Sequence, residues 1–250
     1  MPSLDKAKRY IQRMVRAAGR RIAAQEQDFD PAFFPLARKV RGYTMTSPQR
    51  QHALYQAVQF VVANNIPGSF VECGVYRGGS SLLAALAFAE LGDRRDLWLY
   101  DTYAGMTPPT EFDSKPNLSA EGTAEYFKQS DTGEHNEWCY ASLADVKQCL
   151  ALANYPEDKV RYVVGDVVKT LAGNKPEQIA ILRLDTDFYD STKAELEQLY
   201  GLLSPGGILI IDDYGSWDGA RKAVDEFNAA LPRPLFLARI DETGRIAQKP

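Results

Sequence analysis

Two runs of apolar residues in the C-terminal half give the clearest pattern in the chain. Ile179–Leu184 and 208–211 are short and bounded by polar residues, which is typical of buried parallel strands. An amphipathic stretch and a Pro-Gly-Gly turn separate them. Carboxylates follow both runs, and these are Asp185, Asp187, Asp212 and Asp213. The pattern predicts a β–α–β unit that presents four acids at one edge of a sheet.

The same alternation occurs upstream. It predicts strands at 69–73, 96–100 and 159–164, and helices at 48–64, 80–91, 142–152 and 220–230. Two short runs, 234–240 and 245–248, predict a closing antiparallel hairpin. Strands that alternate with helices indicate an α/β protein of Rossmann-like type. We therefore expect a mostly parallel seven-stranded sheet with a terminal antiparallel hairpin and helices on both faces.

All five parallel strands are predicted to end at an acid, and these acids are Glu72, Asp101, Asp166, Asp185 and Asp212. Ligands of such sheets bind beyond the carboxyl ends of the strands. A single acid there is often a helix cap. A full row of like charges is unfavourable unless cations or hydroxyl groups compensate it. The row therefore predicts a ligand site along this edge.

Two segments interrupt the alternation. Residues 1–47 are predicted to form an N-terminal helical arm or lid, with an amphipathic helix at 3–24 followed by an irregular stretch at 28–47. Residues 102–139 form a polar insertion with a possible short helix near 120–128, and loops of this length usually close over a site or bind a partner. The domain proper is expected to span 48–250.

Composition narrows the class of protein. A net charge of −4 over 250 residues argues against nucleic acid as a partner, because no basic stripe is left once the basic N-terminal arm is set aside. No apolar run reaches the roughly 18–20 residues that span a bilayer, so no membrane is expected. Two histidines and three cysteines without CxxC spacing argue against zinc and suit a reducing cytosol. We expect a cytoplasmic enzyme that acts on a small molecule.

The turn after the first upstream strand has the features of a nucleotide-binding loop. Gly74 can make a tight turn, and Gly78 and Gly79 allow the backbone to approach a ligand where the helix opens at Ser80. Asp101, at the next strand end, can accept hydrogen bonds from both hydroxyl groups of a ribose. A helix or turn cap is the alternative role for Asp101.

Glu72 restricts which nucleotide is expected. A carboxylate before the glycines repels a pyrophosphate and attracts an ammonium group. S-adenosylmethionine carries a sulfonium and an ammonium and no phosphate, whereas a dinucleotide fits less well. Asp166 is placed to accept from an adenine amino group. The site for S-adenosylmethionine, called the donor site below, is therefore predicted to comprise Glu72, Gly74, Gly78, Ser80, Asp101 and Asp166.

The motifs GYTMTSPQR, VECGVYRGGS, YDTYAGM, LRLDTDFYDST and LSPGGILIIDDY together resemble the macrocin O-methyltransferase (TylF-type) family over about residues 40–240. The resemblance implies a class I methyltransferase fold, S-adenosylmethionine as donor, Mg²⁺, and a homo-oligomer. It implies Asp185, Asp212 and Asp213 as metal ligands and Asp187 as general base. Thr186 departs from the family pattern, which often has Gly there, and this leaves the base assignment open.

The predicted reaction is methyl transfer to a hydroxyl of a sugar or vicinal diol of a natural product. Metal ligation acidifies a hydroxyl that is otherwise a poor nucleophile, and Asp187 then takes its proton. His52 and His135 are the alternative bases, and His135 lies in the insertion. Arg183, a charge inside an apolar strand, is expected to pair with one of the nearby acids. A DxD-type glycosyltransferase built on Asp185 and Asp187 and a non-catalytic scaffold are the alternative functions.

Overall fold

The computed structural model describes residues 28–250. The helix predicted at 3–24 lies outside the described residues. The parallel part of the sheet comprises β1 (Ser69–Cys73), β2 (Leu97–Asp101), β3 (Val160–Val164), β4 (Ile179–Leu184) and β5 (Leu203–Ile211), and the terminal hairpin comprises β6 (Ala238–Arg239) and β7 (Arg245–Gln248). The spatial order is β3-β2-β1-β4-β5-β7-β6. Strands β1 to β5 pair in parallel and β7 pairs antiparallel with β5 and β6. The predicted seven-stranded sheet is confirmed.

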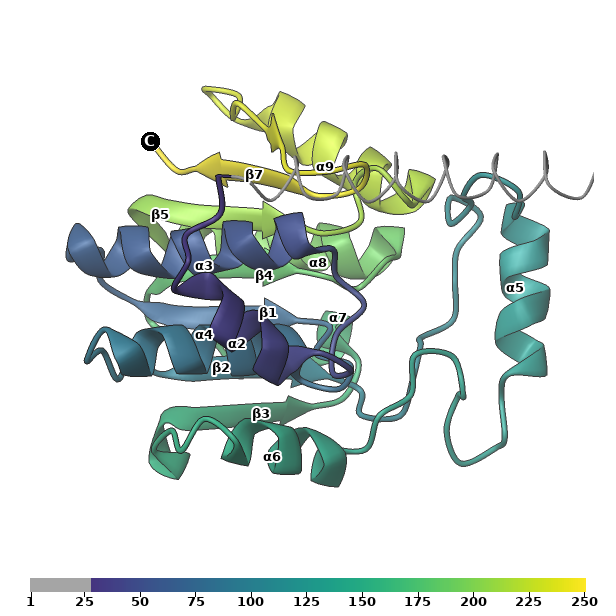
Figure 1. The fold of residues 1–250 in the computed structure, drawn as a ribbon. Coiled ribbons are helices and arrows are strands. Elements are labelled where there is room, and N and C mark those ends of the chain that lie inside the picture. Colours follow the sequence, from purple (N-terminus) through teal and green to yellow (C-terminus); the bar gives the residue numbers. More distant parts are fainter. Residues whose placement is uncertain (1–27) are drawn as a thin grey trace, which may run out of the picture.

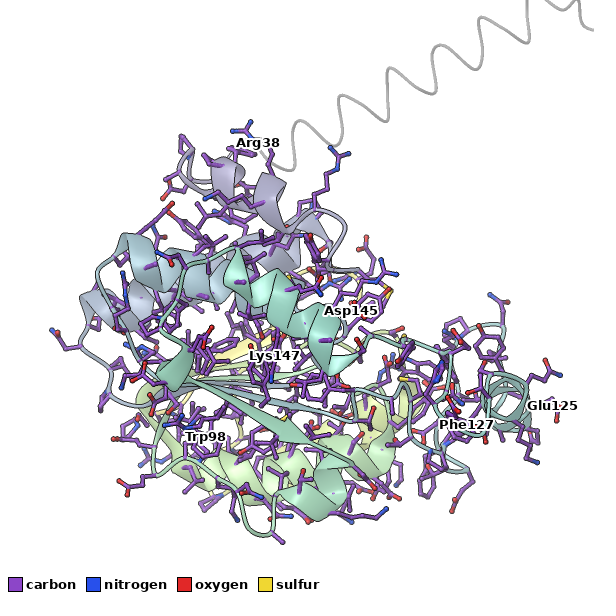
Figure 2. The ribbon with its side chains drawn as sticks, turned by 90° about the horizontal axis from the view of Figure 1, so that it is seen from below. Arg38, Trp98, Glu125, Phe127, Asp145 and Lys147 are labelled. Carbon is purple, nitrogen blue, oxygen red and sulfur yellow. The ribbon has the colours of Figure 1, made fainter. Side chains whose placement is uncertain are left out.

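Helices cover both faces of this sheet (Figures 1 and 2). One face carries α2 (Phe33–Val40), α3 (Pro48–Ala63), α4 (Gly79–Glu90) and α6 (Leu143–Ala151), and the other carries α7 (Val167–Thr170), α8 (Tyr189–Leu199) and α9 (Asp218–Ala230). Successive strand residues face opposite layers, since Ile181 packs with the first group and Leu182 with the second. Both layers are therefore apolar cores and the sheet is buried on both sides.

The sequence prediction was wrong at two places. Residues 28–47 were expected to be irregular, but they contain α2. Pro35 lies in the first turn of this helix, where a missing N–H costs no intrahelical hydrogen bond. The Pro-Gly-Gly segment is not a turn but part of β5. The sheet register shifts there, and Gly206 adopts a φ of 79°.

The insertion is anchored at its base. Figure 1 shows α5 (Ala120–Gln129) standing apart from the sheet, and Figure 2 shows Glu125 and Phe127 on this projecting arm. The carboxylate of Asp113 is fully buried and accepts a 2.8 Å hydrogen bond from the N–H of Tyr189, the first residue of α8. Trp138 packs against Phe188, with ring centroids 5.7 Å apart. The base of the insertion is thus fixed beside the loop that follows β4.

Candidate active site

Three carboxylates converge because β4 and β5 are neighbours that end at the same level. The N–H of Asp185 bonds to the carbonyl of Cys73, and the N–H of Asp212 bonds to that of Leu184, so the ladder continues into these residues. One oxygen each from Asp185, Asp212 and Asp213 lies within 4.8 Å of the others. Such a set of hard oxygen atoms matches the preference of Mg²⁺.

One atom of this group lacks a partner. Oδ2 of Asp213 is buried and, among residues 28–250, no group forms a hydrogen bond with it. A buried carboxylate oxygen without a partner is costly. A divalent cation among the three carboxylates would remove that cost, so the residues present fit the metal that the sequence resemblance implies.

Arg183 organises the acids from beneath. The register places it opposite Glu72 on β1, and its guanidinium pairs with Glu72. Its Nη2 also lies 2.8 Å from both Asp185 and Asp212. Its side chain is only 3% exposed, so these contacts are shielded from water. The expectation that Arg183 pairs with a nearby acid is confirmed, and it pairs with three of them.

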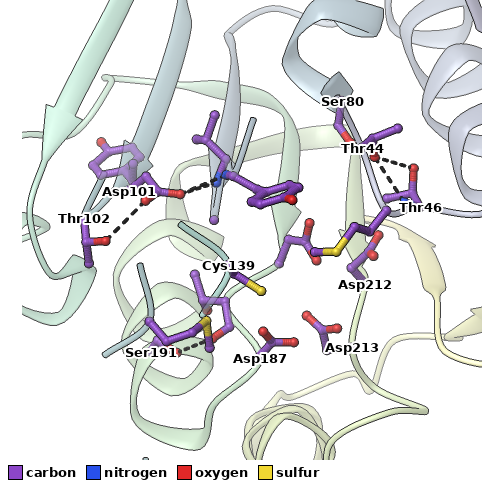
Figure 3. A pocket seen from close by; sticks show the side chains of 18 of the residues that line it. Thr44, Thr46, Ser80, Asp101, Thr102, Cys139, Asp187, Ser191, Asp212 and Asp213 are labelled. Atoms are coloured by element: carbon purple, nitrogen blue, oxygen red, sulfur yellow. Dashed lines mark hydrogen bonds between the residues drawn. The ribbon is translucent and has the colours of Figure 1, made fainter. Parts of the chain in front are cut away.

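Asp187 lies beside this group, and Figure 3 shows its carboxylate next to that of Asp213. The residue adopts a φ of 67°, a left-handed conformation that is uncommon for a residue with a side chain. Burial, followed by the charge of Asp185, raises the pKa of Asp187 to about 7. A carboxyl that titrates near neutral pH is suited to accept a proton during a reaction.

Thr186 and Glu195 support the conformation of this loop. The hydroxyl of Thr186 lies 2.9 Å from Oε1 of Glu195, which is fully buried on α8. Burial raises the pKa of Glu195 well above its ordinary value. Thr186 therefore has a defined partner beneath the loop.

The raised pKa of Asp187 predicts how the stability of the metal-free protein varies with pH. An unfolded aspartate titrates near 4, and the folded side chain titrates near 7. The stabilising contribution is present below about pH 4 and is lost as the pH rises through 7. In EDTA, we expect the midpoint of Asp187→Asn to rise relative to the unchanged chain by roughly 5 °C between pH 5 and 8. Thermal unfolding over this range measures it, and a constant difference would contradict the shift.

A cavity of about 270 Å³ joins the acids to the glycine-rich turn (Figure 3). Of the predicted donor residues, Gly74, Ser80 and Asp101 line it. Gly74 is required there, because a Cβ atom would come within 2.0 Å of the carbonyl oxygen of Asp185. The turn after β1 therefore packs directly on the loop after β4, which places both halves of the site in one cavity.

Asp101 has more partners than the sequence indicated. Its carboxylate accepts hydrogen bonds from the backbone N–H groups of Val75 at 2.7 Å, Tyr76 at 3.0 Å and Tyr103 at 2.7 Å. It thus ties the glycine-rich turn to the end of β2. Because a carboxylate offers about four acceptor positions, little capacity is left for a ribose, and the ribose role stays a prediction.

Glu72 and Asp166 are not at the cavity wall, contrary to the sequence prediction. Glu72 has no exposed surface, and its oxygens bind Arg183 and Ser81. Its charge is thus compensated within the core and it supports Arg183. Asp166 caps α7 by accepting from the N–H of Val168 at 3.0 Å and pairs with Lys169. The adjacent Gly165 and Val167 line the cavity instead.

Gly78 does not line the cavity either. It caps the N-terminus of α4 in the left-handed conformation. At Gly79, a Cβ would come within 2.6 Å of the backbone of Tyr43. The backbone of Tyr43 therefore approaches the start of α4 closely, so the glycine there accommodates the chain itself and not only a ligand.

Sequence reasoning missed several lining residues. Residues 43–46 and Arg50 come from the N-terminal side, and Met106, Thr107 and Cys139 come from the insertion. Cys139 has a φ of 53°. The motif GYTMTSPQR covers the first group, so the resemblance pointed to it without a chemical reason. Nothing in the sequence pattern singled out the second.

Both histidines lie away from the cavity wall as the described residues define it. His52 is buried in α3 and stacks on Phe29 with ring centroids 4.1 Å apart. His135 stacks on Tyr140 at 4.0 Å and bonds to Glu137. The structure therefore gives no support to His52 or His135 as the alternative base.

Comparisons with known proteins identify the family. The macrocin-O-methyltransferase (TylF) family model matches residues 6–249. The 8-demethyl-8-(2,3-dimethoxy-alpha-L-rhamnosyl)-tetracenomycin-C 4'-O-methyltransferase of Streptomyces olivaceus is 33% identical over 220 residues, covering 88% of this chain and 80% of its own. The demethyldecarbamoylnovobiocin O-methyltransferase of Streptomyces niveus is 31% identical over 204 residues, covering 81% of this chain and 74% of its own.

A solved structure agrees with these relatives. The O-methyltransferase NovP superposes with a TM-score of 0.71 at 29% identity, covering 83% of this chain and 82% of its own. The fold is that of the class I O-methyltransferases, as the motifs predicted. The chain therefore belongs to the macrocin O-methyltransferase (TylF) family and is an S-adenosylmethionine-dependent O-methyltransferase.

Proposed function

We propose that the protein methylates a hydroxyl group on the sugar of a natural product, with Mg²⁺ held by Asp185, Asp212 and Asp213 and with Asp187 as the general base. The observation that carries this proposal is the shared cavity. Its wall includes the glycine-rich turn at one end and all four aspartates at the other. The name of the Streptomyces olivaceus relative, which includes a rhamnosyl group, supports a sugar as the acceptor, and both relatives are named for natural products.

The geometry suggests a division of labour. A divalent cation on the three carboxylates would supply Lewis acidity, which lowers the pKa of a sugar hydroxyl. Asp187 is beside this position and accepts the hydroxyl proton as the oxygen forms its bond to the methyl carbon and the carbon–sulfur bond of the donor breaks. The remaining acceleration is positioning. Met106, Thr107 and Cys139 of the insertion close the cavity on one side.

Titration calorimetry with nucleotides tests the donor. We expect S-adenosylhomocysteine to bind and UDP and NAD to show no heat of binding. Family membership already argues against the glycosyltransferase alternative, because the family is one of methyltransferases. Turnover of a panel of glycosides with labelled donor, with and without EDTA, tests the acceptor class and the metal. Binding of UDP in preference to S-adenosylhomocysteine would overturn the proposal.

We expect Asp101→Ala to weaken binding of S-adenosylhomocysteine by about tenfold or more, because hydrogen bonds to an ionised group contribute roughly 1.5–3 kcal/mol. The same titration with a 2′,3′-dideoxy analogue separates two causes. If Asp101 binds the ribose, the substitution has little effect on the analogue. An equal loss for both ligands would mean that Asp101 acts only through Val75 and Tyr76.

Assembly and location remain predictions. The three cysteines are free thiols, which suits the proposed cytoplasmic location. None of the helices within residues 28–250 is long and apolar enough to cross a membrane. A homo-oligomer is expected from the family resemblance, and sedimentation would measure it.

A further inference from the structure

Arg50 links the metal-binding acids to two other segments of the chain. It lies in the first turn of α3 and lines the cavity. Its Nη1 pairs with Oδ2 of Asp212, and its Nε lies 3.0 Å from Oδ2 of Asp241. Asp241 belongs to the turn between β6 and β7. Arg50 thus joins the N-terminal part of the cavity, the end of β5 and the C-terminal hairpin.

Asp212 is paired on both oxygens. Oδ1 accepts from Nη2 of Arg183 at 2.8 Å, and Oδ2 accepts from Arg50. The two arginines differ in their surroundings. Arg183 is held by Glu72 and Asp185 as well, so it cannot leave without exposing buried charges. Arg50 is 16% exposed at the cavity, and its second partner lies outside the three carboxylates.

Asp241 is a fixed partner. Its Oδ1 accepts from the backbone N–H groups of Thr243 at 2.9 Å and Gly244 at 2.7 Å. Its Oδ2 accepts from the hydroxyl of Ser47, which also caps α3 by accepting from the N–H of Arg50 at 3.1 Å. Asp241 and the start of α3 are therefore joined by contacts that do not involve Asp212.

A cation at Asp212 and the charge of Arg50 are incompatible neighbours. Like charges a few ångströms apart repel by about 1 kcal/mol or more even in a watery environment, and both groups use the same carboxylate. We propose that Arg50 is a positioning residue that exchanges with the divalent cation. It holds Oδ2 of Asp212 while the cation is absent and is retained by Asp241 when the cation binds. This inference rests on the proposed metal site.

Titration calorimetry with MgCl₂ on the full chain tests the exchange through variants with opposite expected signs. Arg50→Gln removes the competing charge, and we expect Mg²⁺ to bind more tightly, on the order of tenfold. Asp241→Asn leaves Arg50 with Asp212 as its charged partner, and we expect Mg²⁺ to bind several-fold more weakly. In the double variant the Asp241 effect should vanish, because its mediator is gone.

Two further measurements accompany this cycle. In Arg50→Gln, the rise in thermal midpoint on adding Mg²⁺ should be larger than in the unchanged chain, because the metal-free form loses one partner of Asp212. Arg50→Lys keeps the positive charge but not the planar guanidinium fork. Its affinity for Mg²⁺ should lie between that of the unchanged chain and that of Arg50→Gln. Arg95→Gln is the matched control, because Arg95 is similarly buried and pairs with Asp93 before β2, at the end of the parallel strands opposite to the acids.

The outcomes separate this inference from the proposed function. If Arg50→Gln and Asp241→Asn both weaken Mg²⁺ binding, or both leave it unchanged, Arg50 is a structural support and the exchange is overturned. If the unchanged chain does not bind Mg²⁺ at all, the metal site of the proposed function is overturned, and the exchange with it. Unchanged affinity in Arg95→Gln together with the opposite signs supports the exchange.

Discussion

Replacing Asp213 with Asn is expected to reduce kcat/KM by roughly a thousandfold or more and to weaken Mg²⁺ binding by at least about a hundredfold, since even outer partners of a metal site contribute 10- to 100-fold. The substitution removes one of three converging negative charges while it conserves shape. Binding of S-adenosylhomocysteine should be nearly unchanged, because the side chain of Asp213 lies at the acidic end of the cavity. Calorimetry with each ligand and steady-state kinetics measure the three quantities.

Asp185→Asn is expected to have the same effects as Asp213→Asn on kcat/KM, on Mg²⁺ binding and on binding of S-adenosylhomocysteine. Asp158→Asn is the matched control, because it makes the same change on the exposed turn before β3, at the opposite edge of the sheet. The assignment of metal ligands would be wrong if the unchanged enzyme kept full activity in EDTA. It would also be wrong if Asp213→Asn lost donor binding and Mg²⁺ binding to the same extent.

Replacing Arg183 with Met is expected to destabilise the protein by about 3–5 kcal/mol, because breaking a buried ion pair leaves its partners uncompensated. Here three acids lose their partner, and Glu72 and Asp212 are almost entirely buried. For a chain of this length the loss corresponds to a fall in midpoint of roughly 10 °C. Denaturant titration and calorimetry give the free energy and the midpoint.

A second variant keeps this prediction testable if Arg183→Met does not fold. The double variant Glu72→Met with Arg183→Met removes both buried partners and should recover part of the lost stability. Arg161→Met is the control, because Arg161 is an exposed arginine on β3 and surface changes usually stay within about 0.5 kcal/mol. An equal effect of Arg161→Met and Arg183→Met would refute the role of Arg183 in holding the acids together.

The strands were predictable because strands buried on both faces appear as continuous apolar runs. Ile179–Leu184 and Ser69–Cys73 agree with the structure residue for residue. The start of β5 was not predictable. Its Pro-Gly-Gly segment is held in the sheet by Lys249. The backbone N–H of Gly206 donates to the carbonyl of Lys249, and the N–H of Lys249 donates to the carbonyl of Gly207, both at 2.8 Å. That partner lies more than 40 residues away, and local propensity contains no information about it.

The sequence also indicated the acidic strand ends but not the function of each acid. Glu72 lies near the end of one apolar run and Asp185 directly follows another, and both were expected to contact a ligand. The register places Glu72 one residue inside the strand and opposite Arg183, so it is buried in the core. Asp166 is used as a helix cap. A carboxylate's role depends on which donors surround it, and those donors come from distant segments.

The sequence by itself determined the α/β class, the positions of most strands and the concentration of acids at their carboxyl ends. These features depend on short stretches of sequence, because a buried strand is a continuous apolar run and the residue that follows it lies at its carboxyl end. Only the tertiary structure decided which partner each acid meets. The sheet order puts β1 beside β4, which is not its neighbour in the chain, and this brings Glu72 opposite Arg183. Contacts of Arg50 with Asp212 and Asp241 span more than 160 residues, and such pairings are fixed by packing rather than by local pattern.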